Sequence, residues 1–369
     1  MRMTQLKTIA DIQTGPFGSQ LHKEDYVETG TPIVTVEHLG NRVFTEQNLP
    51  RVSDSDKARL IKYTLSTGDI VFSRVGSVDR CSYVDKSHDG WMFSGRCLRV
   101  RPTELVDSLY LYYYFCLEET KQFVRNIAVG ATMPSINTKL LGEVEIALPD
   151  LNNQKRIAAV LSSLDDKIEN NQKLNDNLQQ QAQAIYSSMF IDNPDPAWSH
   201  GHLSDLITVK YGKDHKKLAD GIYPVYGSGG IMRYVERPLY NKESVLIPRK
   251  GTLNNVMYVN QPFWSVDTMF YTEMKLPNVA KFVYHFVKAK DLASMNAGSA
   301  VPSMTTDILN AMEVVIPSAS ALEEFESLVA PMYEAMEAND VQSKALSQMR
   351  DTLLPKLMSG AIDVSDVQL

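Results

Sequence analysis

The chain has 369 residues, of which 44% are hydrophobic and 22% charged, with a formal net charge of −7 at pH 7. This balance is typical of folded globular proteins and excludes an intrinsically disordered chain, while the length leaves room for two or three domains. No apolar run approaches the ~18 residues of a membrane-spanning helix, and the N-terminal stretch MRMTQLKTIADIQ lacks the apolar core of a signal peptide, so we expect a cytoplasmic protein.

The cysteines and the distribution of charge add two constraints. Cys81, Cys97 and Cys116 show no metal-binding spacing and are typical of free thiols in a reducing compartment. Residues 319–369 carry nine acidic and three basic side chains, so the rest of the chain is close to neutral. The net charge therefore does not exclude a nucleic-acid partner, because the distribution of charge matters more than its sum.

Near the N-terminus, two glycine-containing turns carry polar and basic side chains. The stretch TGPFGSQLHK presents Ser19, Gln20 and Lys23, and GDIVFSRVGS presents Arg74 beside a strand of β-branched residues. Because a glycine turn lets the backbone approach a phosphate closely, we interpret these four side chains as candidate DNA contacts. Ordinary solvated surface is the alternative interpretation.

Residues 151–191 contain no glycine and predict one long helix. Apolar side chains recur at steps that are mostly three, four or seven, which is the pattern of one helix of a coiled coil. The side chains of this stripe are Ile157, Leu161, Leu164, Ile168, Leu174, Leu178, Ile185 and Met189. We therefore expect this helix to pack against a second helix and to act as a spacer.

Residues 192–318 form the second predicted globular region, with further polar and basic side chains on glycine-containing loops. The candidate DNA contacts are Lys210, Tyr211, Lys213, Lys216 and Lys217 in KYGKDHKK, Ser228 and Arg233 in VYGSGGIMR, and Arg249 and Lys250 in IPRKG. The group of lysines around Tyr211 is the strongest of these signals, since phosphates attract clustered positive charge. A solvated loop is the alternative interpretation.

Two passages of the chain repeat each other. GATMPSINTKLLGEVEIALP (130–149) and GSAVPSMTTDILNAMEVVIP (298–317) align without a gap at a shift of 168 and share seven identical residues, among them Ser135 and Ser303. No base accompanies either serine, so a duplicated nucleophile is not indicated. We interpret the passages as sockets that join a globular region to the helix that follows. Both serines are included as candidate DNA contacts, because a Gly–x₃–Pro–Ser turn can approach the duplex.

A weaker repeat lies upstream of these passages. GDIVFSRVGSVDRCSYVD (68–85) and ESVLIPRKGTLNNVMYVN (243–260) share four identical residues at a shift of 175. Both predict a strand, a glycine turn and a second strand. The segments that precede them show no convincing match.

The second repeat also ends in a predicted helix, within residues 319–369. The apolar side chains at positions equivalent to the first stripe are Phe325, Met332, Met336, Leu346 and Leu353. Asn171 and Asn339 also correspond, and buried asparagines of this kind fix the register of paired helices; a solvent-exposed stretch is the alternative. Pro331 and Pro355 predict kinks in the second helix.

Together these elements predict an α+β fold with a pseudo-two-fold repeat. The expected parts are a first globular domain at 1–150, a first helix at 151–191, a second globular domain at 192–318, and a second helix with a C-terminal tail at 319–369. If the halves are related by a two-fold axis, the helices form an antiparallel coiled coil. Duplex DNA with two separated half-sites is a partner of matching symmetry.

No catalytic or metal-binding constellation is indicated. DNPDPAW (192–198) departs from the short Asn/Asp, double-proline and aromatic motif of adenine methyltransferases. Asp267, Glu273 and Lys275 loosely fit a nuclease site but lie in a stretch that alternates like a half-buried strand. A self-contained DNA methylase or nuclease with its own recognition domains is the alternative function, and a scaffold that binds only proteins is a second.

The chain resembles the specificity subunit of type I restriction–modification systems. The resemblance covers nearly the whole chain and is carried by GPFGS, GDIVFSRVGS, the paired passages ending ALP and VIP, NQKRIAAVLSSLDDKIENNQK, YPVYGSGG and LLPKLMSGAI. It implies that each globular domain is an α/β target-recognition domain that reads one half of a bipartite site in double-stranded DNA. It also implies that the chain is noncatalytic and that the coiled coil sets the spacer.

The same resemblance implies partners and places the cofactors on them. Two methyltransferase subunits would bind S-adenosylmethionine and methylate adenine in each half-site. Motor–nuclease subunits would use ATP and Mg²⁺ to translocate and cleave unmodified DNA. No cofactor or metal is expected in this chain.

Overall fold

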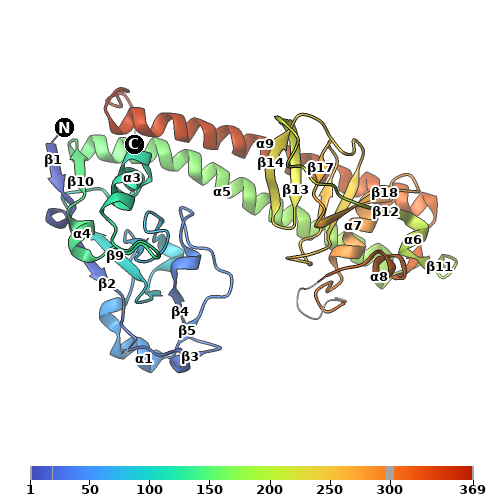
Figure 1. Ribbon diagram of the computed structural model, residues 1–369, viewed down its shortest axis with the longest axis horizontal. Coiled ribbons are helices and arrows are strands. Elements are labelled where there is room, and N and C mark those ends of the chain that lie inside the picture. Colours follow the sequence, from blue (N-terminus) through green and yellow to red (C-terminus); the bar gives the residue numbers. More distant parts are fainter. Residues whose placement is uncertain (1, 19, 296–302, 368–369) are drawn as a thin grey trace. The chain divides into compact units, whose positions relative to one another are not determined.

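The chain folds into two compact units. The computed structural model describes the following residues: 2–18, 20–295 and 303–367. Unit 1 comprises Met1–Asn171 and Val341–Leu369, and unit 2 comprises Gln172–Asp340. Each unit therefore contains a globular head and a segment of each of two long helices (Figure 1). The predicted α+β fold, with two globular parts and a long helix between them in sequence, is confirmed.

Three small sheets form the head of unit 1. The first has the order β2-β9-β6-β7, the second has the order β3-β5-β4-β8, and β1 pairs with β10. All pairs are antiparallel except β4 with β8. The strands are β1 (Arg2–Gln5), β2 (Ala10–Thr14), β3 (Tyr26–Val27), β4 (Thr31–Val34), β5 (Arg51–Val52), β6 (Ile70–Ser73), β7 (Cys81–Tyr83), β8 (Met92–Phe93), β9 (Cys97–Pro102) and β10 (Glu145–Leu148).

Short helices cover this head. They are α1 (Asp54–Arg59), α2 (Ser108–Cys116), α3 (Glu118–Ile127) and α4 (Thr138–Gly142). The side chain of Asp107 accepts a hydrogen bond from the Tyr110 backbone N–H and so caps the start of α2. Most of α2 is buried, including Tyr110, Leu111 and Phe115, because it lies between the first sheet and the long helices.

Unit 2 has the same plan with fewer strands. Its strands are β11 (Ser199–His202), β12 (Ile207–Tyr211), β13 (Asp220–Gly227), β14 (Gly230–Val235), β15 (Ser244–Pro248), β16 (Met257–Val259), β17 (Trp264–Ser265), β18 (Met269–Met274) and β19 (Glu313–Ile316). Its helices are α6 (Leu203–Leu206), α7 (Ala280–Lys288) and α8 (Thr306–Asn310). The sheets have the orders β12-β18-β15-β16, β14-β13-β17 and β11-β19, and only β13 with β17 is parallel.

The two heads therefore repeat sheet by sheet. The sheet β2-β9-β6-β7 corresponds to β12-β18-β15-β16, and the parallel pair β4–β8 corresponds to β13–β17. Both predicted hairpins are present, as β6–β7 and β15–β16. The correspondence includes β2 and β12, which precede the segments where the sequence shows a repeat. The absence of a sequence match there was therefore no sign of a different fold, since a strand needs only an alternating pattern and not particular residues.

The two long helices lie side by side and antiparallel within each unit. Their bounds are Leu151–Ser187 for α5, which continues as a π-helical turn at Ser188–Asp192, and Ala319–Met358 for α9. In unit 1, Asp165 of α5 accepts a hydrogen bond from Arg350 of α9, and further along α5 Asn171 donates to Ser343. Residue numbers thus rise along α5 as they fall along α9. The helix α9 runs unbroken through the prolines at which kinks were predicted.

Unit 2 shows the same antiparallel pairing. The Asn175 side chain donates to the backbone oxygen of Met336 at 3.3 Å and to Asp340 Oδ1 at 2.8 Å. Asn339 donates to Asn175 Oδ1 at 2.8 Å. Polar side chains thus join the two helices within each unit. A separate property of the helices in the described residues is that none is long and apolar enough to cross a membrane.

Each head shares a hydrophobic core with the helix segments of its own unit. In unit 1, Leu161 of α5 and Leu357 of α9 belong to the cluster that contains Tyr110 of α2. In unit 2, Tyr186 of α5 and Phe325 of α9 belong to the cluster around α7. The helices are therefore part of each folded unit.

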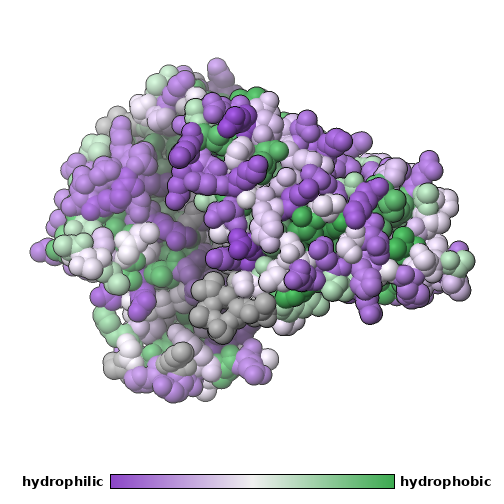
Figure 2. All heavy atoms as spheres, turned by 45° about the vertical axis from the view of Figure 1, so that its right-hand side comes forward, coloured by the Kyte–Doolittle hydropathy of each residue, from purple (hydrophilic) through white to green (hydrophobic). Residues whose placement is uncertain are grey.

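On the face drawn in Figure 2, hydrophilic side chains predominate and hydrophobic ones form small patches between them.

Candidate nucleic-acid interface

An arginine follows an inner strand of a four-stranded sheet in each head. Arg74 comes directly after β6, and Arg249 comes directly after β15. The backbone N–H of Arg74 donates to Arg96 O at 2.8 Å, and that of Arg249 donates to Thr268 O at 2.8 Å. The two arginines therefore occupy the same place in the two heads, as the sequence repeat predicts.

The two guanidinium groups have equivalent surroundings. Arg74 Nη1 donates to Gly95 O at 3.0 Å, and its guanidinium carbon lies 5.5 Å from the centre of the Phe17 ring. Arg249 Nη1 donates to Asp267 O at 3.2 Å, and its guanidinium carbon lies 5.4 Å from the centre of the Tyr211 ring. Among the residues that the structure describes, neither guanidinium forms an ion pair, so each charge is available to a ligand.

A glycine brings each aromatic ring into place. The Gly15 N–H donates to Cys97 O, and the Gly212 N–H donates to Met269 O. A Cβ atom on Gly15 would lie 2.1 Å from Ser94 O, and one on Gly212 would lie 2.0 Å from Val266 O. Only glycine allows the chain to pass so close to the neighbouring backbone.

The repeated passages meet these arginines. The Ile136 N–H donates to Arg74 O at 2.9 Å, and the Met304 N–H donates to Arg249 O at 2.9 Å. Backbone bridges also join Val75 to Ser135 and Lys250 to Ser303. The structure thus brings each predicted serine beside the arginine of its own unit.

In unit 1 the other predicted contacts differ in their surroundings. Gln20 is engaged inside the head, because its Oε1 accepts from the Tyr63 hydroxyl at 2.7 Å. Ser19 and the side chain of Lys23 lie outside the described residues. Arg74 lines a surface hollow of about 570 Å³ together with Phe17, Tyr26, Glu37 and Arg96.

In unit 2 the basic residues divide into paired and unpaired ones. Lys210 Nζ lies 3.6 Å from Glu273, and Arg233 Nη2 lies 2.7 Å from Asp220. The exposed side chains without an ion pair to any described residue are Lys213, Lys216, Lys217 and Lys250. Ser228 lies beside the hairpin turn, since a Cβ atom on Gly251 would meet Ser228 Oγ at 2.7 Å.

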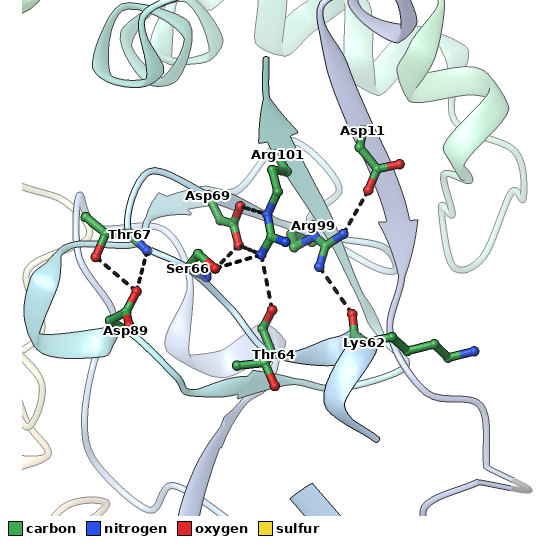
Figure 3. A network of polar contacts seen from close by, with 9 residues as sticks. All are labelled: Asp11, Lys62, Thr64, Ser66, Thr67, Asp69, Asp89, Arg99 and Arg101. Atoms are coloured by element: carbon green, nitrogen blue, oxygen red, sulfur yellow. Dashed lines mark hydrogen bonds and ion pairs between the residues drawn. The ribbon is translucent and has the colours of Figure 1, made fainter. Parts of the chain in front are cut away.

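Two further arginines in unit 1 have their charge neutralised inside the head (Figure 3). Arg101 forms a bidentate ion pair with Asp69, in which Nε donates to Oδ1 and Nη2 donates to Oδ2, both at 2.7 Å. Arg99 Nη2 donates to Asp11 Oδ2 at 2.8 Å. Because Asp69 is buried, this network serves to fix β9 and the loop before β6.

The predicted coiled-coil residues lie along the helix pair. The buried ones are Ile157, Leu161 and Phe325, and the half-buried ones are Leu164, Ile168, Leu178, Ile185, Met332, Met336, Leu346 and Leu353. Leu174 is 51% exposed and lies outside this set. The buried side chains of α5 also include polar ones, among them Asp165 and Asn171.

Polar side chains connect each head to its helices. In unit 1, the Tyr113 hydroxyl donates to Asp165 Oδ2 at 2.7 Å, and Arg350 Nη1 donates to Asp165 Oδ1 at 2.6 Å. Burial, and then the Asp165 carboxylate, raise the pKa of Tyr113. Burial alone would lower the pKa of Arg350, but its hydrogen bond to Asp165 and the charge of Asp165 raise it.

In unit 2, the corresponding contacts use different residues. His285 Nε2 lies 3.0 Å from the Tyr333 hydroxyl, and its Nδ1 lies 2.8 Å from Gln183 Oε1. Burial lowers the pKa of His285 to about 4. Lys281 of α7, which is 4% exposed, forms an ion pair with Glu326 of α9 at 2.5 Å.

No group of three or more His, Cys, Asp or Glu side chains in the described part of the chain is arranged to hold a metal ion. Among the residues considered for a nuclease site, Glu273 pairs with Lys210 and Lys275 Nζ donates to Ser204 O.

The YGSGG stretch forms the turn between β13 and β14. The buried thiol of Cys97 has its pKa raised to about 12 by burial, as fits an unreactive free cysteine.

Comparison with known proteins decides the family. Residues 1–180 and 197–324 match the family described as the type I restriction modification DNA specificity domain. The chain belongs to this family. Both heads are thus covered by the match, each with its own copy of the domain.

Named relatives are specificity subunits. The MjaIX type I restriction enzyme specificity subunit of Methanocaldococcus jannaschii is 27% identical over 310 residues, which is 72% of each chain. The HindI specificity subunit of Haemophilus influenzae is 21% identical and covers 82% of this chain and 88% of its own. This chain is accordingly a specificity component rather than a catalytic subunit.

A solved structure shares the fold. The crystal structure of the type I restriction–modification S subunit from M. genitalium superimposes with a TM-score of 0.62 at 19% identity, and covers 96% of this chain and 95% of that one. The residues that sequence reasoning missed are Phe17, Gly212 and Arg96. Phe17 is the aromatic residue of the GPFGS motif, but the sequence does not reveal its contact with Arg74, because the two residues belong to distant segments of the chain.

Proposed function

We propose that this chain reads a bipartite site in double-stranded DNA, with each unit reading one half. The observation that carries the proposal is that one chain of the DNA specificity family has two heads with the same arginine, aromatic ring and serine at the same place. Two equivalent surfaces on two different heads fit two half-sites of different sequence. The two long helices set the separation of the half-sites.

The helices also dock the catalytic partners. Exposed apolar side chains on them support this part of the proposal: Leu174, Leu328, Val341 and Met349 are 47–65% exposed. Two methyltransferase subunits bind there and carry S-adenosylmethionine, and motor–nuclease subunits carry ATP and Mg²⁺. The complex works in the cytoplasm and methylates adenine in each half-site.

Binding of the assembled complex to synthetic duplexes tests the proposal. The site is first identified from the adenines that the complex methylates. The complex is expected to bind that duplex at least a thousandfold more tightly than an unrelated one, and scrambling either half is expected to remove most of this preference. Changing the base pairs between the two half-sites should leave the affinity of the complex for the duplex unchanged.

Two outcomes contradict the proposal. Methyl transfer by the isolated chain would show a self-contained enzyme. Equal binding of the correct and scrambled duplexes by the complex would show that the chain does not supply specificity.

A further inference from the structure

The arginine–aromatic pair is kept in both heads although the chain around it has changed. The ring comes two residues after Gly15 in unit 1 and one residue before Gly212 in unit 2. Phe17 is 55% exposed and Tyr211 is 52% exposed, so neither ring is needed to fill a core. The same geometry thus arises from different local sequences, which points to a shared ligand.

Two half-sites of different base sequence still share the phosphodiester backbone. We propose that Arg74 and Arg249 are paired phosphate anchors, each holding one backbone phosphate of its half-site without reading a base. This inference rests on the proposed function and names the part of the DNA that these two residues bind.

The geometry of each guanidinium fits a phosphate. A carbonyl oxygen accepts from Nη1, at 3.0 Å in unit 1 and 3.2 Å in unit 2, and the guanidinium carbon lies over the aromatic ring. Two contacts therefore hold each guanidinium before DNA binds, and Nε and Nη2 are not hydrogen-bonded to any described residue. Two N–H donors in a planar fork match two oxygens of one phosphate.

Neighbouring side chains differ between the heads, unlike the anchors. Arg96 accepts the backbone hydrogen bond of Arg74, whereas Thr268 has this place beside Arg249. Glu37 lines the hollow in unit 1, and a carboxylate cannot contact a phosphate favourably. Arg96 and Thr268 thus differ between the heads, whereas the arginine, the aromatic ring and the serine are shared.

The two hairpins provide matched control residues. Arg74 lies at one end of the β6–β7 hairpin and the exposed Lys86 follows its other end. In the same way, the exposed Lys242 precedes β15 at the end opposite to Arg249. Replacing either lysine with alanine removes one positive charge beside the same hairpin, at the end away from the anchor.

The experiment measures the affinity of the assembled complex for the duplex that it methylates and for an unrelated duplex, at several salt concentrations. R74A and R249A are each expected to weaken binding to both duplexes by the same factor, about tenfold. Each is expected to reduce the slope of log affinity against log salt by about 0.9, as for one lost phosphate contact. R74K should keep most of the slope, and K86A and K242A should change neither quantity.

Three outcomes overturn the inference. A loss confined to the methylated duplex would show that the arginines read bases. Unchanged affinity for both duplexes would remove them from the interface. Loss of methyltransferase subunits from the complex would show a protein contact in their place. If the wild-type complex itself does not distinguish the duplexes, the proposed function fails, whatever the arginine variants do.

Discussion

Tyr113 and His285 occupy the same place in the two units. Tyr113 lies on α2 and donates to Asp165 of α5, while His285 lies on α7 and pairs with Tyr333 of α9. Asp165 and Tyr333 are themselves equivalent, since they lie 168 residues apart, the same shift as the repeated passages. The pseudo-two-fold repeat therefore extends to the side chains that join each head to the helices, although their chemistry differs.

In unit 1 this junction depends on an ion pair between the half-buried Arg350 and the buried Asp165. We expect R350M to lower the free energy of unfolding by about 3 kcal/mol, because it leaves the buried Asp165 carboxylate without its cation. Chemical denaturation measures the change. K356M, at an exposed position of the same helix, should stay within about 0.5 kcal/mol of wild type. If the loss comes from an unpaired charge, adding D165N to R350M should recover part of it; no recovery would contradict this explanation.

In unit 2 the junction makes stability depend on pH. The pKa of His285 is lowered from 6.5 to about 4, so between these values the unfolded chain binds a proton that the folded chain does not. The contribution of His285 should therefore be complete above pH 6.5 and fall by about 3 kcal/mol as the pH drops to 4. Unfolding curves of wild type and H285Q, compared across this range, isolate the effect. A parallel pH dependence in both proteins would disprove it.

The close approach at Gly15 and Gly212 predicts that neither position accepts alanine. G15A and G212A should each lower the free energy of unfolding by about 2 kcal/mol, because the new Cβ atom meets backbone that cannot yield easily. Each should also weaken DNA binding, since the nearby ring moves. G18A and G229A are the controls, because a Cβ atom there meets nothing within 4 Å. Thermal unfolding should be unchanged in these two proteins.

The lysine loop of unit 2 is predicted to contribute positive charge to the interface. Exchanging Lys213 and Lys216 together for glutamate should weaken DNA binding and flatten its salt dependence by about two units of slope. Exchange for glutamate of the exposed Lys242, which lies at the end of β15 opposite to Arg249, is the control. Unchanged affinity of the Lys213 and Lys216 double variant would exclude this loop from the DNA footprint.

Sequence patterns were informative where a contact is local or repeats at a fixed shift. The seam of α5 could be predicted because a helix turns every 3.6 residues, and the equivalence of Arg74 and Arg249 followed from the hairpin repeat. Contacts between distant segments could not be predicted in this way. The ring of Phe17 meets Arg74 across 57 residues of sequence, and no periodicity connects them.

The ion pairs between side chains were the other feature that could not be predicted from the sequence. Lys210 and Arg233 belong to basic stretches like those of Lys213 and Arg249, but they are neutralised by Glu273 and Asp220 on neighbouring strands. Strand register decides which charges meet, and register depends on the whole sheet. Asp165 and Tyr186 were missed at the helix junction because each packs against its head as well as the other helix.

The most direct test of bipartite recognition is the sequence around every methylated adenine in DNA modified by the complex. Two short specific sequences, separated by a constant number of unspecified base pairs and each with one methylated adenine, are the predicted result. A single uninterrupted sequence, or two sequences at variable separation, would contradict the account in which two heads on paired helices each read one half-site.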